Sequence, residues 1–333
     1  MTASLHALTV MDAADVARCG AYLDLVEALE QGHRESPPLV ERLVFGPAGT
    51  SQTFMALPAW QPGEAIAAKL VTVVPDNPDA RGIPAVQAVL VLFDGITGSP
   101  SALIDGTELT YRKTAADSAL GSRLCSRPDA ATLLMVGAGA LAPHLIAAHR
   151  AVRGSIEHVL VWNRSPGRAL ALVEAGLADE VVEDLDGAVG RADIICTATS
   201  SRDPLIHGRF LQPGTHLDCV GAFLPYHREV DDEVVRRARI VVDSRPSTIA
   251  GSGDLVIPLA AGVIEPDDVL GDLYQLVQGE ITGRTRPDQI TLFENGGGGH
   301  LDLMVARHLV RRFTDQSQAP APAPAPAPEE AQP

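Results

Sequence analysis

The sequence predicts an α/β protein: a Rossmann domain with a doubly wound parallel sheet, joined to a mainly antiparallel β (α+β) domain. Two observations carry this prediction. Strand and turn patterns follow one another directly through the first third of the chain, as in antiparallel sheets. From Ala131 onward, strand–turn–helix units repeat instead, and the first unit contains a glycine-rich turn that begins at Gly137.

The first domain begins with a predicted helix over Ala13–Gly32. Apolar and β-branched residues then predict strands over Leu39–Phe45, Thr53–Ala59, Ala65–Val74, Ala85–Phe93 and Ser101–Ile104. The segments 75–82 and 94–100 are rich in glycine, proline and aspartate, which predicts turns between the strands. A helix rich in small residues is expected over Lys113–Ser126.

The Rossmann domain starts with a buried strand that runs into the glycine-rich turn, followed by a helix over Pro143–Arg153. Further strands and helices are predicted over 158–165, 166–174, 180–182, 185–189, 193–198, 216–220, 233–238 and 240–242. A last helix, His300–Phe313, is expected to return to the first domain. We therefore expect a discontinuous first domain over 1–114 and 300–315, a Rossmann domain over 115–299, and a disordered Ala-Pro tail over 316–333.

Charge and composition exclude several classes of function. The formal net charge of −16 disfavours nucleic acids and anionic membranes as partners, because both bind basic surfaces. No secretory signal begins the sequence, and no apolar run reaches the length of a membrane span. The four cysteines show no CxxC spacing, so we expect free thiols, no metal centre and a cytoplasmic protein.

The turn over Gly137, Gly139, Ala140, Leu141 and Ala142 predicts a dinucleotide-binding site. Gly137 permits a tight turn, Gly139 lets a pyrophosphate approach the backbone, and Ala142 lets the next helix pack closely on the strand. The amino end of that helix then offers unpaired N–H groups to the phosphates. The alternative is a glycine-rich loop that binds no cofactor.

The end of the second Rossmann strand bears on the choice of cofactor. Asn163, Arg164 and Ser165 stand where NAD-selective sites place an acidic residue, and Arg168 follows one turn later. A neutral amide with nearby cations suits the 2′-phosphate, so NADP(H) is preferred and NAD(H) remains possible. The alternative is that Arg164 is ordinary surface charge.

Two later strand ends are also expected to contact the cofactor. Thr197, Ala198 and Thr199 follow one strand, and Val220 and Gly221 end the next. The carboxyl ends of parallel strands form the crevice that a dinucleotide crosses. The small hydroxyl residues could instead be ordinary capping or loop residues.

A cluster of cations in the first domain predicts a carboxylate site. Lys69 lies in a predicted strand, and Arg112, Lys113 and Thr114 lie at a predicted helix start. Cations beside a helix N-terminus suit an anionic ligand. Surface charge is the alternative for each of them.

The run from Lys69 to Gly139 resembles the corresponding segment of the ornithine cyclodeaminase/μ-crystallin family. Further matching motifs are Asn-Arg-Ser at 163–165, Gly-Ala-Phe-Leu-Pro at 221–225 with Arg-Glu-Val-Asp at 228–231, Gly-Asp-Leu at 253–255 and Thr-Leu-Phe at 291–293. The resemblance covers residues 1–313. It implies a homodimer with a substrate-binding and dimerisation domain and a Rossmann domain, acting on small imino or amino acids.

The resemblance also implies roles for individual residues. Two residues would be catalytic and would hold the carboxylate and nitrogen of the substrate: Lys69 of the predicted strand, and Arg112 of the R-x-T-A-A segment at 112–116. Arg42 would be a further substrate contact, and Thr114 an adjoining cofactor contact. His300, which follows the glycine run 296–299, is a candidate substrate contact; a structural or surface histidine is the alternative.

Departures from the family pattern favour one activity. Where cyclodeaminases have G-G-D-x-P, this chain has Phe223, which cannot transfer a proton. We therefore expect an NAD(P)H-dependent reductase of cyclic imino acids such as Δ1-pyrroline-2-carboxylate, or the reverse amino-acid dehydrogenase. The alternatives are an ornithine cyclodeaminase and a non-catalytic NADPH-binding protein of μ-crystallin type.

Overall fold

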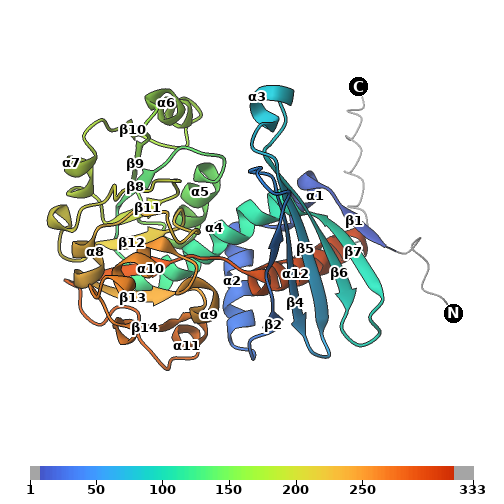
Figure 1. Ribbon diagram of the computed structural model, residues 1–333. Coiled ribbons are helices and arrows are strands. Elements are labelled where there is room, and N and C mark those ends of the chain that lie inside the picture. Colours follow the sequence, from blue (N-terminus) through green and yellow to red (C-terminus); the bar gives the residue numbers. More distant parts are fainter. Residues whose placement is uncertain (1–7, 319–333) are drawn as a thin grey trace, which may run out of the picture.

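The computed structural model describes residues 8–318, which form two lobes with one sheet each (Figure 1). Strands β1 (Thr9–Met11), β2 (Leu39–Val40), β3 (Leu43–Phe45), β4 (Thr53–Gln61), β5 (Ala65–Val73), β6 (Val86–Asp94) and β7 (Pro100–Asp105) form the first sheet. Its order is β1-β7-β6-β5-β4-β2, with β3 also on β4; every pair is antiparallel except β1–β7. The prediction of a mainly antiparallel domain is confirmed.

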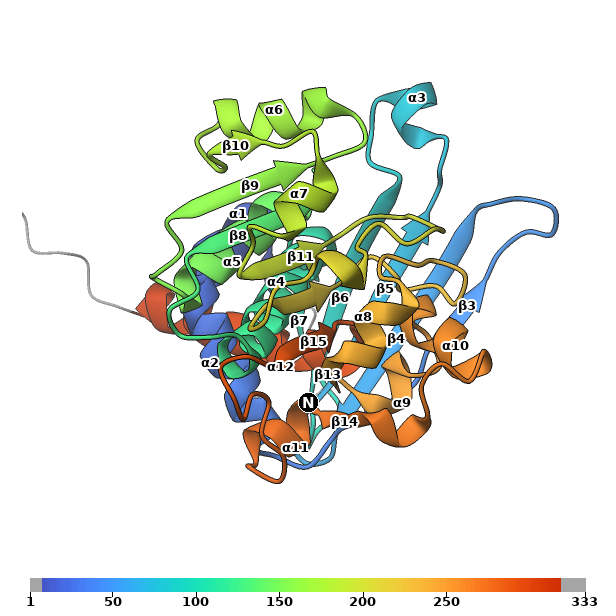
Figure 2. The same ribbon diagram turned by 90° about the vertical axis from the view of Figure 1, so that its left-hand side faces the viewer.

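The second sheet is parallel throughout, in the order β10-β9-β8-β11-β12-β15-β13-β14. Its strands are β8 (Thr132–Val136), β9 (His158–Trp162), β10 (Glu180–Val181), β11 (Ile194–Thr197), β12 (His216–Cys219), β13 (Ala238–Val242), β14 (Val269–Asp272) and β15 (Ile290–Glu294). The order reverses between β8 and β11, which is the switch point where doubly wound sheets bind ligands. The Rossmann prediction is confirmed. Figure 2 looks onto this lobe, with β4–β6 behind it.

Helices cover both faces of the parallel sheet. Along β8, Leu133 and Met135 pack into one apolar core, and Leu134 and Val136 pack into a second core on the opposite face. Helices α4 (Gly106–Cys125), α5 (Ala142–Val152), α6 (Pro166–Glu174) and α11 (Leu273–Val277) contribute to the first core, and α7 (Leu185–Val189), α8 (Asp232–Arg237) and α10 (Gly253–Ala260) contribute to the second. The alternation explains why these strands read as continuous apolar runs.

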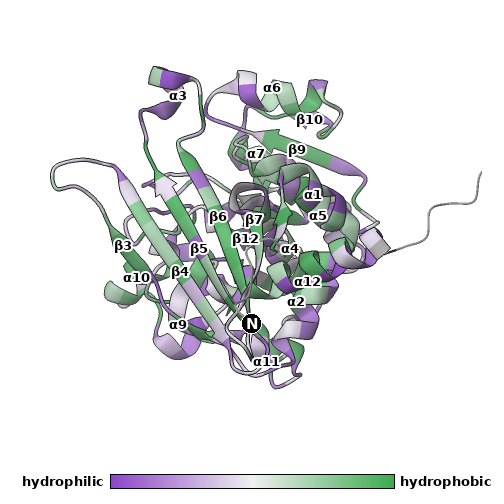
Figure 3. Cartoon of the chain, turned by 90° about the vertical axis from the view of Figure 1, so that its right-hand side faces the viewer, coloured by the Kyte–Doolittle hydropathy of each residue, from purple (hydrophilic) through white to green (hydrophobic). Residues whose placement is uncertain are grey.

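The antiparallel sheet is covered on one face only. Helices α2 (Tyr22–His33) and α12 (Gly299–Gln318) pack together, and α12 lies against β4 and β5. Figure 3 views the opposite face, where β4, β5 and β6 lie in front of the helices. Apolar side chains are exposed along this sheet and its edge: Leu39, Leu43, Val44, Phe45, Trp60, Val86 and Val89.

Several predicted boundaries are wrong. The single helix over Ala13–Gly32 is α1 (Ala13–Cys19) followed by α2, because the chain turns at Gly20, where the close approach of the Val16 carbonyl leaves no room for a Cβ. The predicted strand Leu39–Phe45 is broken into β2 and β3.

The helix expected from Lys113 begins at Gly106, since the side chain of Asp105 caps it by accepting from the Glu108 N–H at 2.8 Å. Arg112 and Lys113 therefore lie in the helix interior and gain nothing from its amino end. Elements that were not predicted include β1, α10, α11, β14, β15, α3 (Asn77–Arg81) and α9 (Arg245–Thr248).

Residues 316–318 of the expected tail belong to α12, and the rest of the tail lies outside the described residues. Within residues 8–318, no helix combines the length and apolar character that crossing a membrane requires.

Candidate active site

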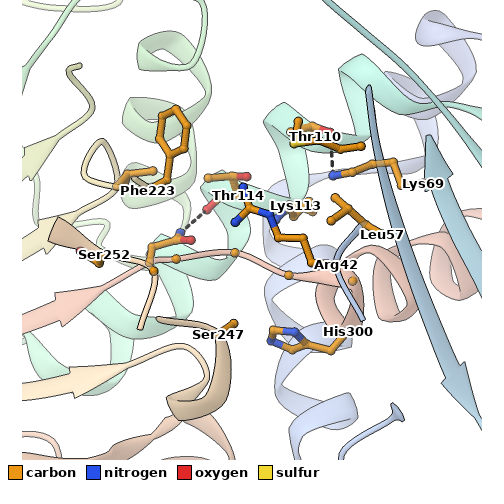
Figure 4. A pocket seen from close by; sticks show the side chains of 18 of the residues that line it. Arg42, Leu57, Lys69, Thr110, Lys113, Thr114, Phe223, Ser247, Ser252 and His300 are labelled. Atoms are coloured by element: carbon orange, nitrogen blue, oxygen red, sulfur yellow. Dashed lines mark hydrogen bonds between the residues drawn. The ribbon is translucent and has the colours of Figure 1, made fainter. Parts of the chain in front are cut away.

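A cavity of about 760 Å³ lies between the two lobes. Its wall includes the glycine-rich turn and the ends of β11 and β12 from one lobe, and β4, β5 and α4 from the other. Figure 4 shows Lys69 and Thr110 on one side, Phe223 and Ser252 on the other, and His300 at the start of α12. The cavity therefore joins the predicted dinucleotide crevice to the predicted substrate cations.

The glycine-rich turn has the shape that a pyrophosphate needs. Gly137 has φ +107°, and a Cβ there would lie 2.6 Å from the Ala198 carbonyl oxygen, whereas the position of a Cβ on Gly139 is open. Among the described residues, the backbone N–H groups of Gly139, Ala140 and Leu141 have no acceptor. These unpaired donors precede α5 and line the cavity, so the residues present fit a dinucleotide.

Asn163 braces this turn. Its Oδ1 accepts from the Ala138 N–H at 3.0 Å, and its Nδ2 donates to the Ser165 carbonyl at 2.9 Å. The side chain therefore fixes the turn and the following strand end to each other. Arg164 and Arg168 are exposed, lie outside the cavity lining and have no carboxylate within 4 Å among residues 8–318.

A buried carboxylate holds the two loops at the switch point. Glu229 accepts from the Thr199 N–H and hydroxyl at 2.7 and 2.6 Å, and from the Thr197 hydroxyl and the Gly221 N–H, both at 2.7 Å. Ala198, Thr199, Val220 and Gly221 line the cavity; Thr197 is buried behind it, bonded to Glu229.

No role for Glu229 was predicted from the sequence, although the Arg-Glu-Val-Asp motif at 228–231, which contains it, is one of the family matches. Burial raises the pKa of Glu229 in spite of its four hydrogen bonds. A second buried carboxylate supports it: Asp254 accepts from the Glu229 and Val230 N–H groups at 2.8 and 3.1 Å. Burial and the charge of Glu229 raise the pKa of Asp254 to about 7.

Lys69 is buried in the cavity wall and is fixed by two partners. Its Nζ donates to Asp302 Oδ1 at 2.9 Å and to the Thr110 hydroxyl at 3.2 Å. Burial lowers the pKa of Lys69, the Asp302 carboxylate opposes this, and the charge of Lys113 lowers it further. Asp302 was not predicted, because it joins Lys69 only through the return of α12 to the first sheet.

Arg112 is not where a substrate could reach it. Its Nε donates to Glu108 at 2.6 Å, its Nη1 donates to the Gly20 carbonyl at 2.8 Å, and its guanidinium lies 5.2 Å from the ring centre of Tyr22. It holds the α1–α2 corner against α4 and does not line the cavity. The expectation for Arg112 is therefore corrected, since one residue along a helix turns a side chain by about 100°.

Lys113 occupies the cavity wall instead. It is 4% exposed, and its Nζ lies 2.9 Å from the ideal Cβ position of Gly297. Among the described residues, no carboxylate oxygen lies within 4 Å of this ammonium. Its charge opposes the raised pKa of the buried Asp117 and Asp243, and an anion bound in the cavity would pair with it directly. Thr114 also lines the cavity, and Arg42 lies exposed at its rim.

His300 completes the wall at the amino end of α12. Its side chain folds back over Gly298, where a Cβ would lie 2.6 Å from the imidazole Nδ1. Burial lowers the pKa of His300 well below its usual value, and the nearby His33 and Lys113 lower it further. The imidazole is therefore uncharged at neutral pH.

The protein has relatives of known family. Residues 5–317 match the ornithine cyclodeaminase/mu-crystallin family. The chain belongs to this family. A relative in Paracoccus denitrificans strain Pd 1222, named Delta(1)-pyrroline-2-carboxylate reductase, is 44% identical over 295 residues, which span 87% of this chain and 92% of the relative.

Solved structures of family members share the whole fold. The Delta(1)-pyrroline-2-carboxylate reductase of Thermococcus litoralis, in complex with NADH and L-proline, has a TM-score of 0.86 at 29% identity, covering 93% of this chain and 98% of that one. An archaeal alanine dehydrogenase dimer with bound NAD has a TM-score of 0.85 at 25% identity, covering 93% and 97%. The family resemblance is thus confirmed.

Proposed function

We propose that this chain is an NAD(P)H-dependent reductase of cyclic α-imino acids, with Δ1-pyrroline-2-carboxylate as the first candidate substrate. The observation that carries the proposal is the unpaired, buried ammonium of Lys113 beside Lys69, in a cavity that continues into the dinucleotide crevice. The similarity to reductases of that substrate supports the choice of ring. The reverse reaction, dehydrogenation of the cyclic amino acid, uses the same site.

The residues of the chain account for binding and orientation. Lys113, with Arg42 at the rim, binds the carboxylate, while Met55, Leu57, Tyr111, Leu141 and Phe223 form apolar walls that suit a small ring and exclude water. The bound cofactor supplies the hydride that the imine carbon takes up. After hydride transfer to the protonated imine, the resulting amine nitrogen takes one proton, which Lys69 is placed to provide because burial makes its ammonium a stronger acid.

Phe223 separates this proposal from the cyclodeaminase alternative. Its ring lines the cavity and packs edge-on against His227, 5.5 Å between ring centres, and it offers no group that holds a proton. The deciding experiment measures NADH and NADPH oxidation with five- and six-membered cyclic imino acids, and with ornithine plus catalytic NAD⁺. Proline and ammonia from ornithine would contradict the proposal, as would cofactor binding with no turnover on any imino acid.

Two finer assignments belong to the same proposal. We infer a preference for NADP(H), because Arg164 and Arg168 are free of carboxylate partners among residues 8–318, beside the strand end where a 2′-phosphate would lie. We also infer a homodimer that buries the exposed apolar side chains of the antiparallel sheet, since patches of this kind usually mark an interface. The dimer of the related alanine dehydrogenase supports this inference.

A further inference from the structure

His300 presents an uncharged, unpartnered nitrogen to the cavity. The residue is 3% exposed and lines the cavity, and its Nδ1 makes no hydrogen bond within residues 8–318. The glycine at 298 makes this possible, because any Cβ there would collide with the ring. The glycine run therefore places the imidazole in the cavity wall.

The opposite edge of the ring faces a buried polar cluster. His300 Nε2, His33 Nε2 and the Tyr274 hydroxyl are all fully buried without a partner. The His33 and Tyr274 ring centres lie 6.0 and 6.2 Å from that of His300. His33 Nδ1 donates to the Leu29 carbonyl at 2.7 Å, so its Nε2 carries a lone pair and needs a donor.

Most of the other polar side chains of the cavity are engaged as donors or positively charged. Two further acceptors line it: the exposed carboxylate of Glu41, and Asn295 Oδ1, which has no partner but is fully buried. Lys69, Lys113 and Arg42 can only donate and carry positive charge. The hydroxyls of Thr110, Thr199, Ser247 and Ser252 donate to Gly106, Glu229, Ser244 and Glu294, respectively. A bound α-imino acid leaves its carboxylate to the cations, and its protonated nitrogen then needs a neutral acceptor.

We propose that His300 is a catalytic residue of the reductase: its neutral imidazole accepts a hydrogen bond from the protonated nitrogen of the cyclic imino acid and so orients the C=N carbon for hydride transfer. The inference rests on the proposed function. The ring stays neutral because burial, His33 of α2 and Lys113 of α4 all disfavour a second proton on it. Tyr274 of α11 carries no charge, and Asp302 on the same helix as His300 is already paired to Lys69.

Substitutions at position 300 test the charge as well as the contact. His300→Gln keeps a neutral acceptor and is expected to retain kcat/KM within about fivefold, whereas His300→Leu loses about 10- to 100-fold, the usual effect of removing a hydrogen bond to a charged group. His300→Arg should lose more than His300→Leu, because a cation repels the protonated imine. His308→Leu is the matched control, since His308 is also buried on α12 but lies outside the cavity lining.

A second measurement does not depend on turnover. In ¹⁵N-histidine NMR, His300 should be neutral at pH 7, and its Nδ1 resonance should shift when L-proline is added to the NAD⁺-bound protein. Unchanged kcat/KM in His300→Leu, or improved kcat/KM in His300→Arg, would overturn the role of His300. Absence of any imine reduction by the wild-type protein would instead refute the proposed function, whatever the NMR result.

Discussion

The two buried lysines of the cavity should differ in how much stability is lost when each is replaced by methionine. Lys69 and Lys113 are both 4% exposed and both line the same cavity. Lys69 has a carboxylate partner, Asp302, at 2.9 Å, and Lys113 has none within 4 Å among the described residues. Methionine has nearly the same length and fills the same volume, so the substitution removes the charge and little else.

The expected magnitudes follow from the partners. Lys69→Met leaves Asp302 buried, with side-chain exposure of 1%, and without its ion pair. Breaking a buried pair in this way costs about 3–5 kcal/mol of unfolding free energy. Lys113→Met breaks no ion pair shorter than 4 Å, although the Lys113 charge opposes the raised pKa of the buried Asp117 and Asp243, so its cost should be smaller than that of Lys69→Met. Both variants should lose about 10- to 100-fold in kcat/KM, because each removes a charged contact to the substrate.

Urea unfolding at pH 7.5 and steady-state kinetics with Δ1-pyrroline-2-carboxylate measure the two effects. The double variant Lys69→Met/Asp302→Leu is the control, since replacing both members of a buried pair with apolar residues is close to neutral for stability. Equal destabilisation by Lys69→Met and Lys113→Met would refute the reasoning, because it would mean that Lys113 is held by a structural partner. Unchanged kcat/KM in Lys113→Met would remove the carboxylate contact from the proposal.

Three further predictions follow from individual contacts. Arg164→Ala should weaken NADPH binding at least tenfold more than NADH binding, measured by cofactor fluorescence titration; equal losses would contradict the 2′-phosphate contact. Glu229→Gln should weaken both cofactors about tenfold, because the new NH₂ group faces a backbone N–H or a hydroxyl that now donates to the carboxylate. Asp254→Asn should flatten the pH dependence of unfolding. Since the Asp254 pKa is raised to about 7 from 3.8, the native state holds a proton that the unfolded chain releases, so wild-type stability should fall as pH rises from about 4 to 7 and then level off. Melting temperatures that fall equally in Asp254→Asn and wild type would count against this explanation.

The nucleotide-binding lobe was predictable because its signals are local. Buried parallel strands read as continuous apolar runs, and the turn at Gly137 combines a positive φ with a close approach to β11 that only glycine tolerates. The alternation of strands and helices then fixed the parallel topology. The glycine turn, the switch-point residues and Lys69 could therefore be placed from residue pattern and family resemblance.

Tertiary structure decided which charges face the cavity. Arg112 and Lys113 are neighbours in sequence, yet the helix that begins at Gly106 turns Lys113 into the cavity and Arg112 onto Glu108 and Gly20. No local pattern distinguishes the two, because the direction of a side chain depends on where its helix starts and on what the helix packs against.

Long-range packing also supplied the partners. Asp302 reaches Lys69 across 233 positions of sequence, and Glu229 joins Thr197, 32 positions away, to Gly221, 8 positions away. The sequence alone determined the fold class and the place of the glycine-rich turn, since both depend on periodicity and backbone freedom. The protonation and pairing of the buried groups came only from the tertiary structure, because burial and neighbouring charge set them.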